Sequence, residues 1–175
     1  SIAQFTSLGS DSVARTTYAN IGESHSTGVS LSVNTTLFQK LNLNINGSSH
    51  YIQFTSTIDG KLRNIDGYDC NVFASAAYRF NKSWRVSGNF SYYSPGIFFQ
   101  GTITGNTRHS ATINKTFLKD GKAALTLTAN NPFQKHRRSH SEINDPSFRL
   151  VQESNSLTRQ LRLSFSYRFG KLQGD

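Results

Sequence analysis

The residues best suited to bind a ligand are four consecutive basic side chains, Lys135, His136, Arg137 and Arg138, with His140 close behind. Phosphate and carboxylate oxygens match this chemistry, because each arginine guanidinium can donate two parallel hydrogen bonds to them. The cluster therefore predicts a contact with an anionic ligand or with lipopolysaccharide. The alternative is an outer loop whose charges are solvated and bind nothing, as is common for charge runs.

Metal binding and catalysis are less favoured. His136 and His140 are four residues apart, a spacing that suits a metal ion on a helix. Their neighbours include Asn, Pro, Ser and Asp, which disfavour a helix, and the adjacent cations repel a metal ion. The chain has no G-x-S-x-G elbow and no H-E-x-x-H motif. The sequence therefore predicts no metal, no cofactor and no enzyme, although some outer-membrane hydrolases draw their catalytic groups from separate strands.

The pattern that must position these groups has a period of two. Residues 161–169 read LRLSFSYRF, so that leucine and aromatic residues alternate with arginine and serine. Successive side chains of a strand point to opposite faces, which gives one apolar face and one charged face. Arginines are poor neighbours in a dry core and good ones beside a water-filled lumen. The pattern therefore predicts a transmembrane β-barrel rather than a sandwich.

The same alternation recurs along the chain and assigns residues to two faces. The lipid face is predicted to include Leu163, Phe165, Leu125, Leu127, Val86 and Phe90. The lumen face is predicted to include Ser164, Thr126, Ser87 and the arginines Arg79, Arg85, Arg162 and Arg168. These arginines could line a ligand path or pair across strands with acidic residues. Their places near the short turns favour pairing or wetting of the lumen.

Strands and connections follow from this alternation. Seven strands are predicted, near residues 26–38, 41–56, 67–80, 84–100, 107–118, 122–134 and 148–169, with a partial eighth before residue 9. Short turns at 38–41, 80–84 and 118–122 alternate with longer loops at 56–67, 101–108 and 130–147. Short turns at one end and long loops at the other are typical of outer-membrane barrels, whose turns are periplasmic. Aromatic residues flank the short turns and predict an interfacial girdle, namely Phe38, Tyr78, Phe80, Trp84, Phe117, Tyr167 and Phe169.

Composition agrees with this fold. Hydrophobic residues make up 35% of the 175 residues and charged residues 17%, as suits strands with one wet face. No run of about 18 apolar residues exists, which argues against helical membrane spans. The single cysteine, Cys70, excludes an internal disulfide framework. The net charge of +9 is scattered outside residues 135–138, and no nucleic-acid partner is predicted.

Several phrases resemble a known family. The last strand, Leu161–Phe169, resembles the terminal signal that the bacterial barrel-assembly machinery reads. The phrases TYANIGESHSTGVSLSV (17–33), AAYRFNKSW (76–84) and LTLTANNPF (125–133) resemble the C-terminal third of TonB-dependent receptors of Bacteroidetes, the outer-membrane β-barrel family. The resemblance implies an outer-membrane location in a Gram-negative bacterium and uptake of a large nutrient such as an iron chelate or a glycan. The implied partners are lipid and lipopolysaccharide, the rest of the barrel with its plug, and a surface lipoprotein.

Three readings of the chain remain open at this point. The first is an all-β, antiparallel up-and-down barrel region, residues 1–175, that forms part of a larger receptor barrel of about 22 strands. The second is a small standalone eight-stranded barrel with an anchoring, adhesion or lipid-modifying role. The third is a soluble lectin-like sandwich. The first reading predicts that residues 1–8 and the last strand, 157–169, do not pair, whereas a closed eight-stranded barrel requires that they do.

Overall fold

The chain folds into β-strands joined by turns, and its only helix in the described residues is one short 3-10 turn, η1 (Lys119–Gly121). The computed structural model describes residues 2–20, 22–58 and 61–169. No helix in this part of the chain is long and apolar enough to cross a membrane. The strands are β1 (Ile2–Leu8), β2 (Ala14–Asn20), β3 (Gly22–Leu37), β4 (Leu41–Ile58), β5 (Lys61–Arg79), β6 (Trp84–Tyr93), β7 (Gly96–Phe98), β8 (Gly101–Ile103), β9 (Asn106–Phe117), β10 (Ala123–Asn130), β11 (His136–Asn144), β12 (Arg149–Leu157) and β13 (Gln160–Tyr167).

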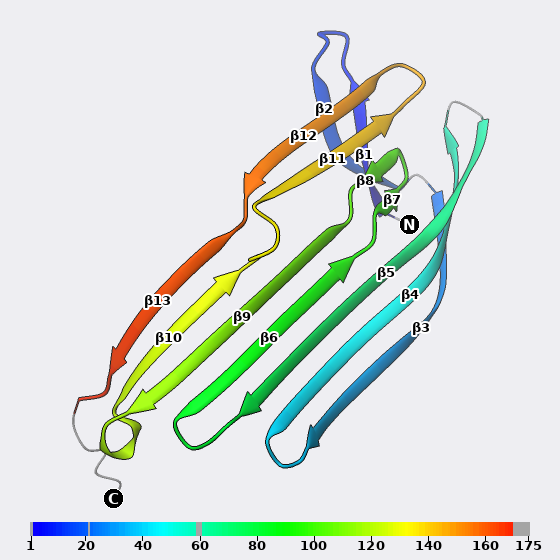
Figure 1. Cartoon of the computed structure of the whole chain (residues 1–175). Coiled ribbons are helices and arrows are strands. Elements are labelled where there is room, and N and C mark those ends of the chain that lie inside the picture. The colour runs from blue at the N-terminus through cyan, green and yellow to red at the C-terminus, as the bar shows by residue number, and fades with distance from the viewer. Residues whose placement is uncertain (1, 21, 59–60, 170–175) are drawn as a thin grey trace, which may run out of the picture.

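The main sheet has seven antiparallel strands in the order β13-β10-β9-β6-β5-β4-β3. These strands correspond one for one to the seven predicted from the alternating pattern, and each lies beside its predecessor in that series (Figure 1). The prediction of an all-β, up-and-down antiparallel arrangement is therefore confirmed.

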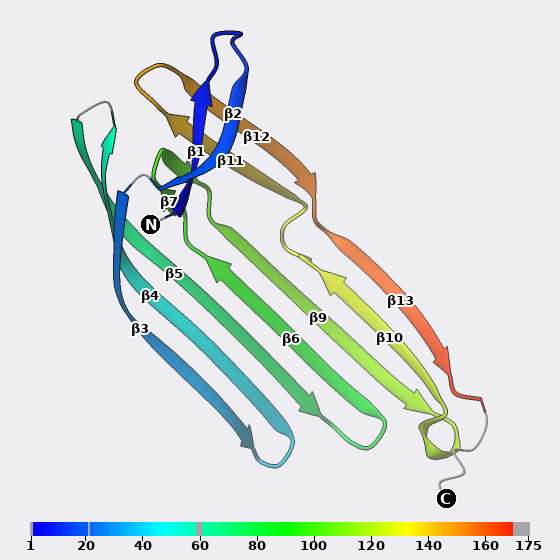
Figure 2. The same ribbon diagram turned by 180° about the vertical axis from the view of Figure 1, so that it is seen from behind.

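Two smaller sheets lie at the end of the main sheet opposite the short turns (Figures 1 and 2). One is the hairpin β1-β2, and the other has four strands in the order β12-β11-β8-β7. The connections at the other end are short, at residues 38–40, 80–83 and 118–122. Their common location confirms the predicted placement of the three turns.

The predicted long loops are largely wrong, because the strands continue into them. Residues 52–58 and 61–67 pair with each other as the upper part of the β4-β5 hairpin. The segment 130–147 contains strand β11, and residues 101–108 contain β8 and the start of β9. The polar, turn-rich composition of these segments predicts loops. They form strands all the same, because a hairpin that extends into water needs no apolar face.

Two predicted strands are interrupted rather than continuous. The strand expected at 84–100 ends at Tyr93, because Pro95 has no backbone N–H for the ladder. The strand expected at 148–169 divides into β12 and β13 at Thr158-Arg159, where both backbone N–H groups donate to the carbonyl of Lys135. The partial strand before residue 9 is confirmed as β1, while its partner β2 was not predicted.

The main sheet has two chemically different faces, because residues directly opposite each other in neighbouring strands share a face. Tyr78, Val86, Ile113, Leu127 and Leu163 form one such row across five strands. The row two residues nearer the short turns on this face is also apolar or aromatic in most strands. The lipid-face and lumen-face residues of the prediction accordingly lie on opposite faces of the sheet.

Almost nothing is buried between these faces. Among the described residues, Phe99 and Ala123 are the only buried hydrophobic residues, and no large side chain is fully buried. On β13, Leu161, Leu163 and Phe165 are 71%, 66% and 63% exposed. A soluble sandwich would hide such side chains between two sheets. The structure therefore contradicts the sandwich alternative.

The main sheet is open. Strands β3 and β13 form its two edges, and they lie at opposite sides of the sheet in both ribbon views (Figures 1 and 2). Strand β1 pairs with β2, while β12 pairs with β11 and β13 with β10. Within the described residues, the first strand and the last strand do not pair, as predicted.

Candidate functional site

The apolar face is bounded by aromatic residues at two levels. On β5 these are Tyr68 and Tyr78, which are ten residues apart, and Tyr68 contacts Tyr51 of β4 with ring centroids 5.2 Å apart. Ten residues at about 3.3 Å each span roughly 33 Å along the strand, and a tilt of about 40° reduces this to a height of roughly 25 Å. This height equals the hydrocarbon-facing band of outer-membrane barrels.

Both aromatic levels shift in the same direction from strand to strand. Tyr78 lies opposite Val86, so the lower aromatic of β6, Trp84, stands two residues nearer the short turns. At the upper level Tyr92 lies opposite Val72, which is four residues nearer the turns than Tyr68. A parallel shift of this kind is expected when tilted strands cross a layer of constant thickness.

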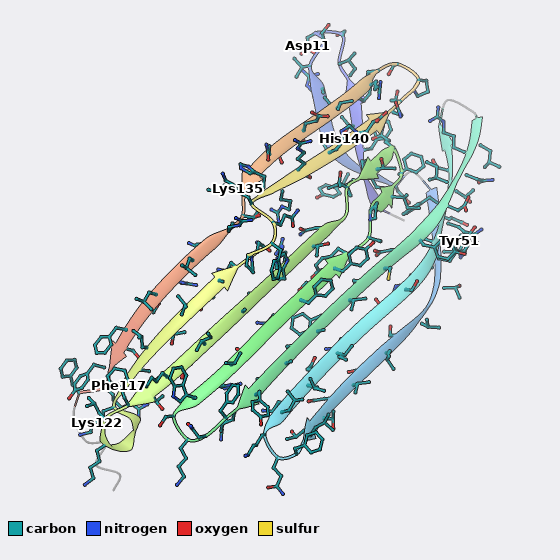
Figure 3. All side chains as sticks on the ribbon, viewed as in Figure 1. Asp11, Tyr51, Phe117, Lys122, Lys135 and His140 are labelled. Carbon is teal, nitrogen blue, oxygen red and sulfur yellow. The ribbon has the colours of Figure 1, made fainter. Side chains whose placement is uncertain are left out.

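The shift continues toward the other edge of the sheet. Phe117 of β9 lies two residues beyond the level of Trp84, and it is opposite Ala123, which in turn is opposite Tyr167. At the upper level Phe133, 89% exposed, stacks on His109 with ring centroids 5.3 Å apart. Figure 3 shows Phe117 at the lower end of the sheet and Tyr51 near its upper end. Tyrosine and tryptophan rings, here Tyr51 and Trp84, are typical of membrane-water interfaces.

A cation also lies on the apolar face, at its lower boundary. Lys115 lies opposite Trp84, and its Nζ atom is 5.0 Å from the centre of the indole ring. A lysine at this level can extend its ammonium group toward water while its stem stays among apolar groups. The position explains why Lys115 interrupts the apolar alternation of β9.

The polar face carries hydrogen bonds between neutral side chains of adjacent strands. For example, the Asn114 amide donates to Thr126 Oγ1 at 2.7 Å, and the Asn71 amide donates to Ser48 Oγ at 2.7 Å. Further pairs of this kind are Ser32–Asn46, Thr36–Asn42, Asn89–Ser110, Thr112–Thr128 and Asn130–Gln160. These groups satisfy one another and remain accessible to water, so the face suits an aqueous lumen.

The four arginines predicted for the lumen lie on the side of the alternation that carries these polar groups. Arg79 and Arg85 are directly opposite each other in the ladder, and Arg162 lies opposite Thr128. None of Arg79, Arg85, Arg162 and Arg168 takes part in a salt bridge with another described residue. The expected pairing with acids of this chain is therefore absent from the described part, and wetting of the face remains.

In the basic cluster at residues 135–138, Lys135 lies just before strand β11, and the other three residues belong to the strand rather than to the loop of the alternative interpretation. Strand β11 begins at His136, so successive side chains point to opposite sides. Arg137 borders a cavity with the main sheet, whereas Arg138 borders a different one with His140 and Glu153. Figure 3 shows Lys135 at the junction of the sheets and His140 further along β11. The four side chains therefore do not converge on one anion.

The cavity beside Arg137 has a volume of about 410 Å³. Its wall is the polar face of β6, β9 and β10, including Arg108, and Arg137 and Gln160 close it from β11 and β13. The turn at Asn131 shapes this corner: its backbone N–H donates to the His109 carbonyl at 2.7 Å, and its side-chain amide donates to the Thr158 carbonyl. Asn131 has a φ of 45°, a left-handed conformation that asparagine tolerates.

A polar network lies on the hairpin of β11 and β12. Glu142 Oε1 accepts hydrogen bonds from Arg149 Nε at 2.9 Å and from Asn144 Nδ2 at 2.8 Å. His140 lies between the carboxylates of Glu142 and Glu153, at 3.5 and 3.2 Å. The hydrogen bond from Arg149, followed by that from Asn144, lowers the pKa of Glu142 from 4.5 to about 2. No group of His, Cys, Asp and Glu in the described residues has the arrangement of a metal site.

We expect the β11-β12 hairpin to lose protection at low pH. Because the folded pKa of Glu142 is lowered, its contribution to stability is present above about pH 4.5 and is lost as the pH falls toward 2. Hydrogen exchange of residues 137–156, corrected for the intrinsic pH dependence of exchange, should show protection falling in this window. A Glu142→Gln variant should show no such fall, and an identical fall in that variant would contradict the assignment.

A second polar contact fixes the β1-β2 hairpin to the four-stranded sheet. The Gln100 side chain, 4% exposed, accepts a hydrogen bond from the Thr6 backbone N–H at 2.7 Å and donates to the Thr6 carbonyl at 2.8 Å. It also donates to Asp145 Oδ2 at 3.2 Å. Gln100 thus satisfies Thr6 as a neighbouring strand would.

Sequence reasoning did not find Arg108, Gln100 or the Glu142–Arg149 pair. Arg108 fell where the predicted loop 101–108 overlaps the predicted strand 107–118, and Thr6, which Gln100 contacts, is 94 residues away from it in the chain. Arg108, Ser110 and Thr112 are every second residue of β9 and therefore share one face. This pattern was the sequence signal that could have placed Arg108 on the polar face.

An open, tilted antiparallel sheet with an apolar band of bilayer height on one face and a wet polar face behind it defines part of the wall of a transmembrane β-barrel. The comparison with protein families agrees with this class: the model of the outer membrane protein beta-barrel family matches residues 1–167. The chain belongs to this family and resides in the outer membrane. Neither the curated proteins nor the solved structures gave a significant match.

The family membership gives each part of the molecule its surroundings. We expect the apolar face to contact lipid and the polar face to line the lumen. We expect the short turns on the periplasmic side and the hairpins at the opposite end outside the cell.

Proposed function

We propose that this chain is the C-terminal wall of a TonB-dependent receptor, of the type found in Bacteroidetes, that imports a large nutrient such as an iron chelate or a glycan. The observation that carries the proposal is the open main sheet, whose edges β3 and β13 do not approach each other. Each unpaired peptide group in hydrocarbon costs several kcal/mol. The edges therefore need further strands, and a barrel of about 22 strands encloses a lumen wide enough for a plug.

Two features of the wall support this reading. The phrases at residues 17–33, 76–84 and 125–133 resemble the C-terminal third of such receptors and fall on the β2-β3 segment, the β5-β6 turn and strand β10. The lumen-facing arginines Arg79 and Arg85 have no acidic partner among the described residues. A plug inside the barrel would supply such partners.

The proposal names further partners. The edge strand β13 and the aromatic pair Tyr167–Phe169, with ring centroids 4.6 Å apart, offer a terminal strand to the barrel-assembly machinery. The outer hairpins would contact lipopolysaccharide and a surface lipoprotein. We propose no catalytic role for the chain.

Transport can be tested in cells. Uptake of a panel of labelled iron chelates and oligosaccharides should fall when the gene is deleted, and it should fall equally when TonB is removed or the proton-motive force is collapsed. Uptake that depends on the gene but not on TonB would contradict the receptor proposal. The alternative of a small barrel predicts that the chain alone inserts into lipid vesicles as a closed, monomeric barrel, in which β1 or β2 pairs with β13.

A further inference from the structure

We infer that the cavity between Arg108 and Arg137 is a binding site for an acidic carbohydrate, that is, an oligosaccharide that carries carboxylate groups. The inference rests on the proposed function and names the substrate class of that receptor. It depends on three observations: two arginines without acidic partners among the described residues, neutral hydrogen-bonding groups in the same cavity lining, and two exposed aromatic rings outside this lining on the same face of the sheet.

The cavity is positively charged. The ten residues that line it include Arg108 and Arg137 and no Asp or Glu. Arg137 Nη1 donates to Asn106 Oδ1 at 3.3 Å, and this is its one side-chain hydrogen bond with the described residues. Arg108 makes no salt bridge with them. Most guanidinium donors of this pair are therefore open to an anion, and a carboxylate matches their fork geometry.

The volume and the neutral lining indicate more than a small ion. A space of about 410 Å³ exceeds what one carboxylate or phosphate fills, and Asn89, Ser110, Asn130 and Gln160 add amide and hydroxyl groups to its wall. Such groups act as both donors and acceptors, which is the requirement of a ligand rich in hydroxyl groups.

The aromatic rings lie on the same face of the sheet. Phe73 is opposite Ser91, which is opposite Arg108, so the three form one row. Tyr93 is opposite Asn106, the residue that holds Arg137. Phe73 and Tyr93 are 41% and 52% exposed although their face is polar and turned away from lipid. Exposed rings in a wet wall can pack against the C–H face of a sugar ring, and this favours a carbohydrate over a free anion.

Binding can be measured on the full-length receptor in detergent by calorimetry, with tetramers of galacturonate, glucuronate and mannuronate as probes and a neutral glucose tetramer as control. We expect at least one acidic tetramer to bind more tightly than the neutral one. Arg108→Gln and Arg137→Gln should each weaken that binding about tenfold, since charge-assisted hydrogen bonds are lost. Phe73→Ala should weaken it several-fold by loss of the stacking surface.

Arg162→Gln is the matched control, because Arg162 is a lumen-facing arginine that does not line the cavity, and it should leave binding unchanged. Three outcomes would overturn the inference: no acidic tetramer binds, Arg162→Gln weakens binding as much as the cavity variants, or inorganic phosphate binds as tightly as the best tetramer. If any one of these outcomes occurs while TonB-dependent uptake of another nutrient persists, the carbohydrate inference fails and the receptor proposal stands.

Discussion

Leu127→Arg is expected to destabilise the barrel by about 2–4 kcal/mol, the cost of an arginine facing lipid at the bilayer midplane. Leu127 lies four residues from Ala123, at the level of the lower aromatics, and four residues from Asn131, whose turn carries the upper aromatic Phe133. It is therefore at the centre of the apolar band on β10. The free energy of folding of the full-length protein into lipid vesicles, measured by urea titration, gives the effect.

Thr126→Arg is the matched control, because Thr126 is the neighbouring residue on the lumen side of the same strand. It loses one hydrogen bond from Asn114, and the new guanidinium group remains in water, so the effect should stay below about 1 kcal/mol. Leu125→Arg, one step nearer the periplasmic aromatics, should be intermediate. Equal damage from Leu127→Arg and Thr126→Arg would show that both faces are dry and would refute the assignment of lipid and lumen.

Gln100→Leu is expected to release the β1-β2 hairpin from the outer sheet. The substitution leaves the buried N–H and carbonyl of Thr6 without their partners, and each such group costs about 1–3 kcal/mol. The membrane-spanning sheet does not include this contact, so we expect local opening while the global stability is unchanged. Hydrogen exchange of residues 2–8 should increase on the order of tenfold to a thousandfold, and trypsin should cut more readily at Arg15.

A glutamine-to-leucine change without buried contacts provides the comparison. Gln152 is exposed on β12, opposite Ser141, and Gln152→Leu should leave the exchange of residues 2–8 unaltered. Unchanged protection in Gln100→Leu would mean that packing, rather than the amide contact, holds the hairpin in place.

The spanning strands could be predicted because both faces of each strand contact a uniform medium. Lipid requires an apolar residue at every second position. Leu125 and Leu127, or Leu161, Leu163 and Phe165, can therefore be assigned to the lipid face without knowing which strands lie beside them. The short turns could be predicted for the same reason, since the apolar alternation stops on either side of them. The structure confirms the order of the seven strands.

The outer hairpins could not be predicted, because water on both sides imposes no alternation. Strand β11 reads His-Arg-Arg-Ser-His and resembles a solvated loop, yet it pairs with β12 over nine residues. The cavity was missed for a related reason: Arg108 and Arg137 are 29 positions apart in the sequence, and only the fold of β9 and β11 brings them to one space. The spacing of charged residues along the chain therefore does not predict which of them line the same cavity.

The neutral hydrogen-bonded wall has a kinetic consequence. A solute that moves along the Asn, Ser and Thr side chains exchanges hydrogen bonds with water for hydrogen bonds of similar strength with the wall. Each position along the wall is therefore a shallow energy well, and the residence time at each is short. In the proposed receptor, Arg108 and Arg137 would lie near the outer end of this surface, where a longer dwell would concentrate the solute without slowing its later movement toward the periplasm.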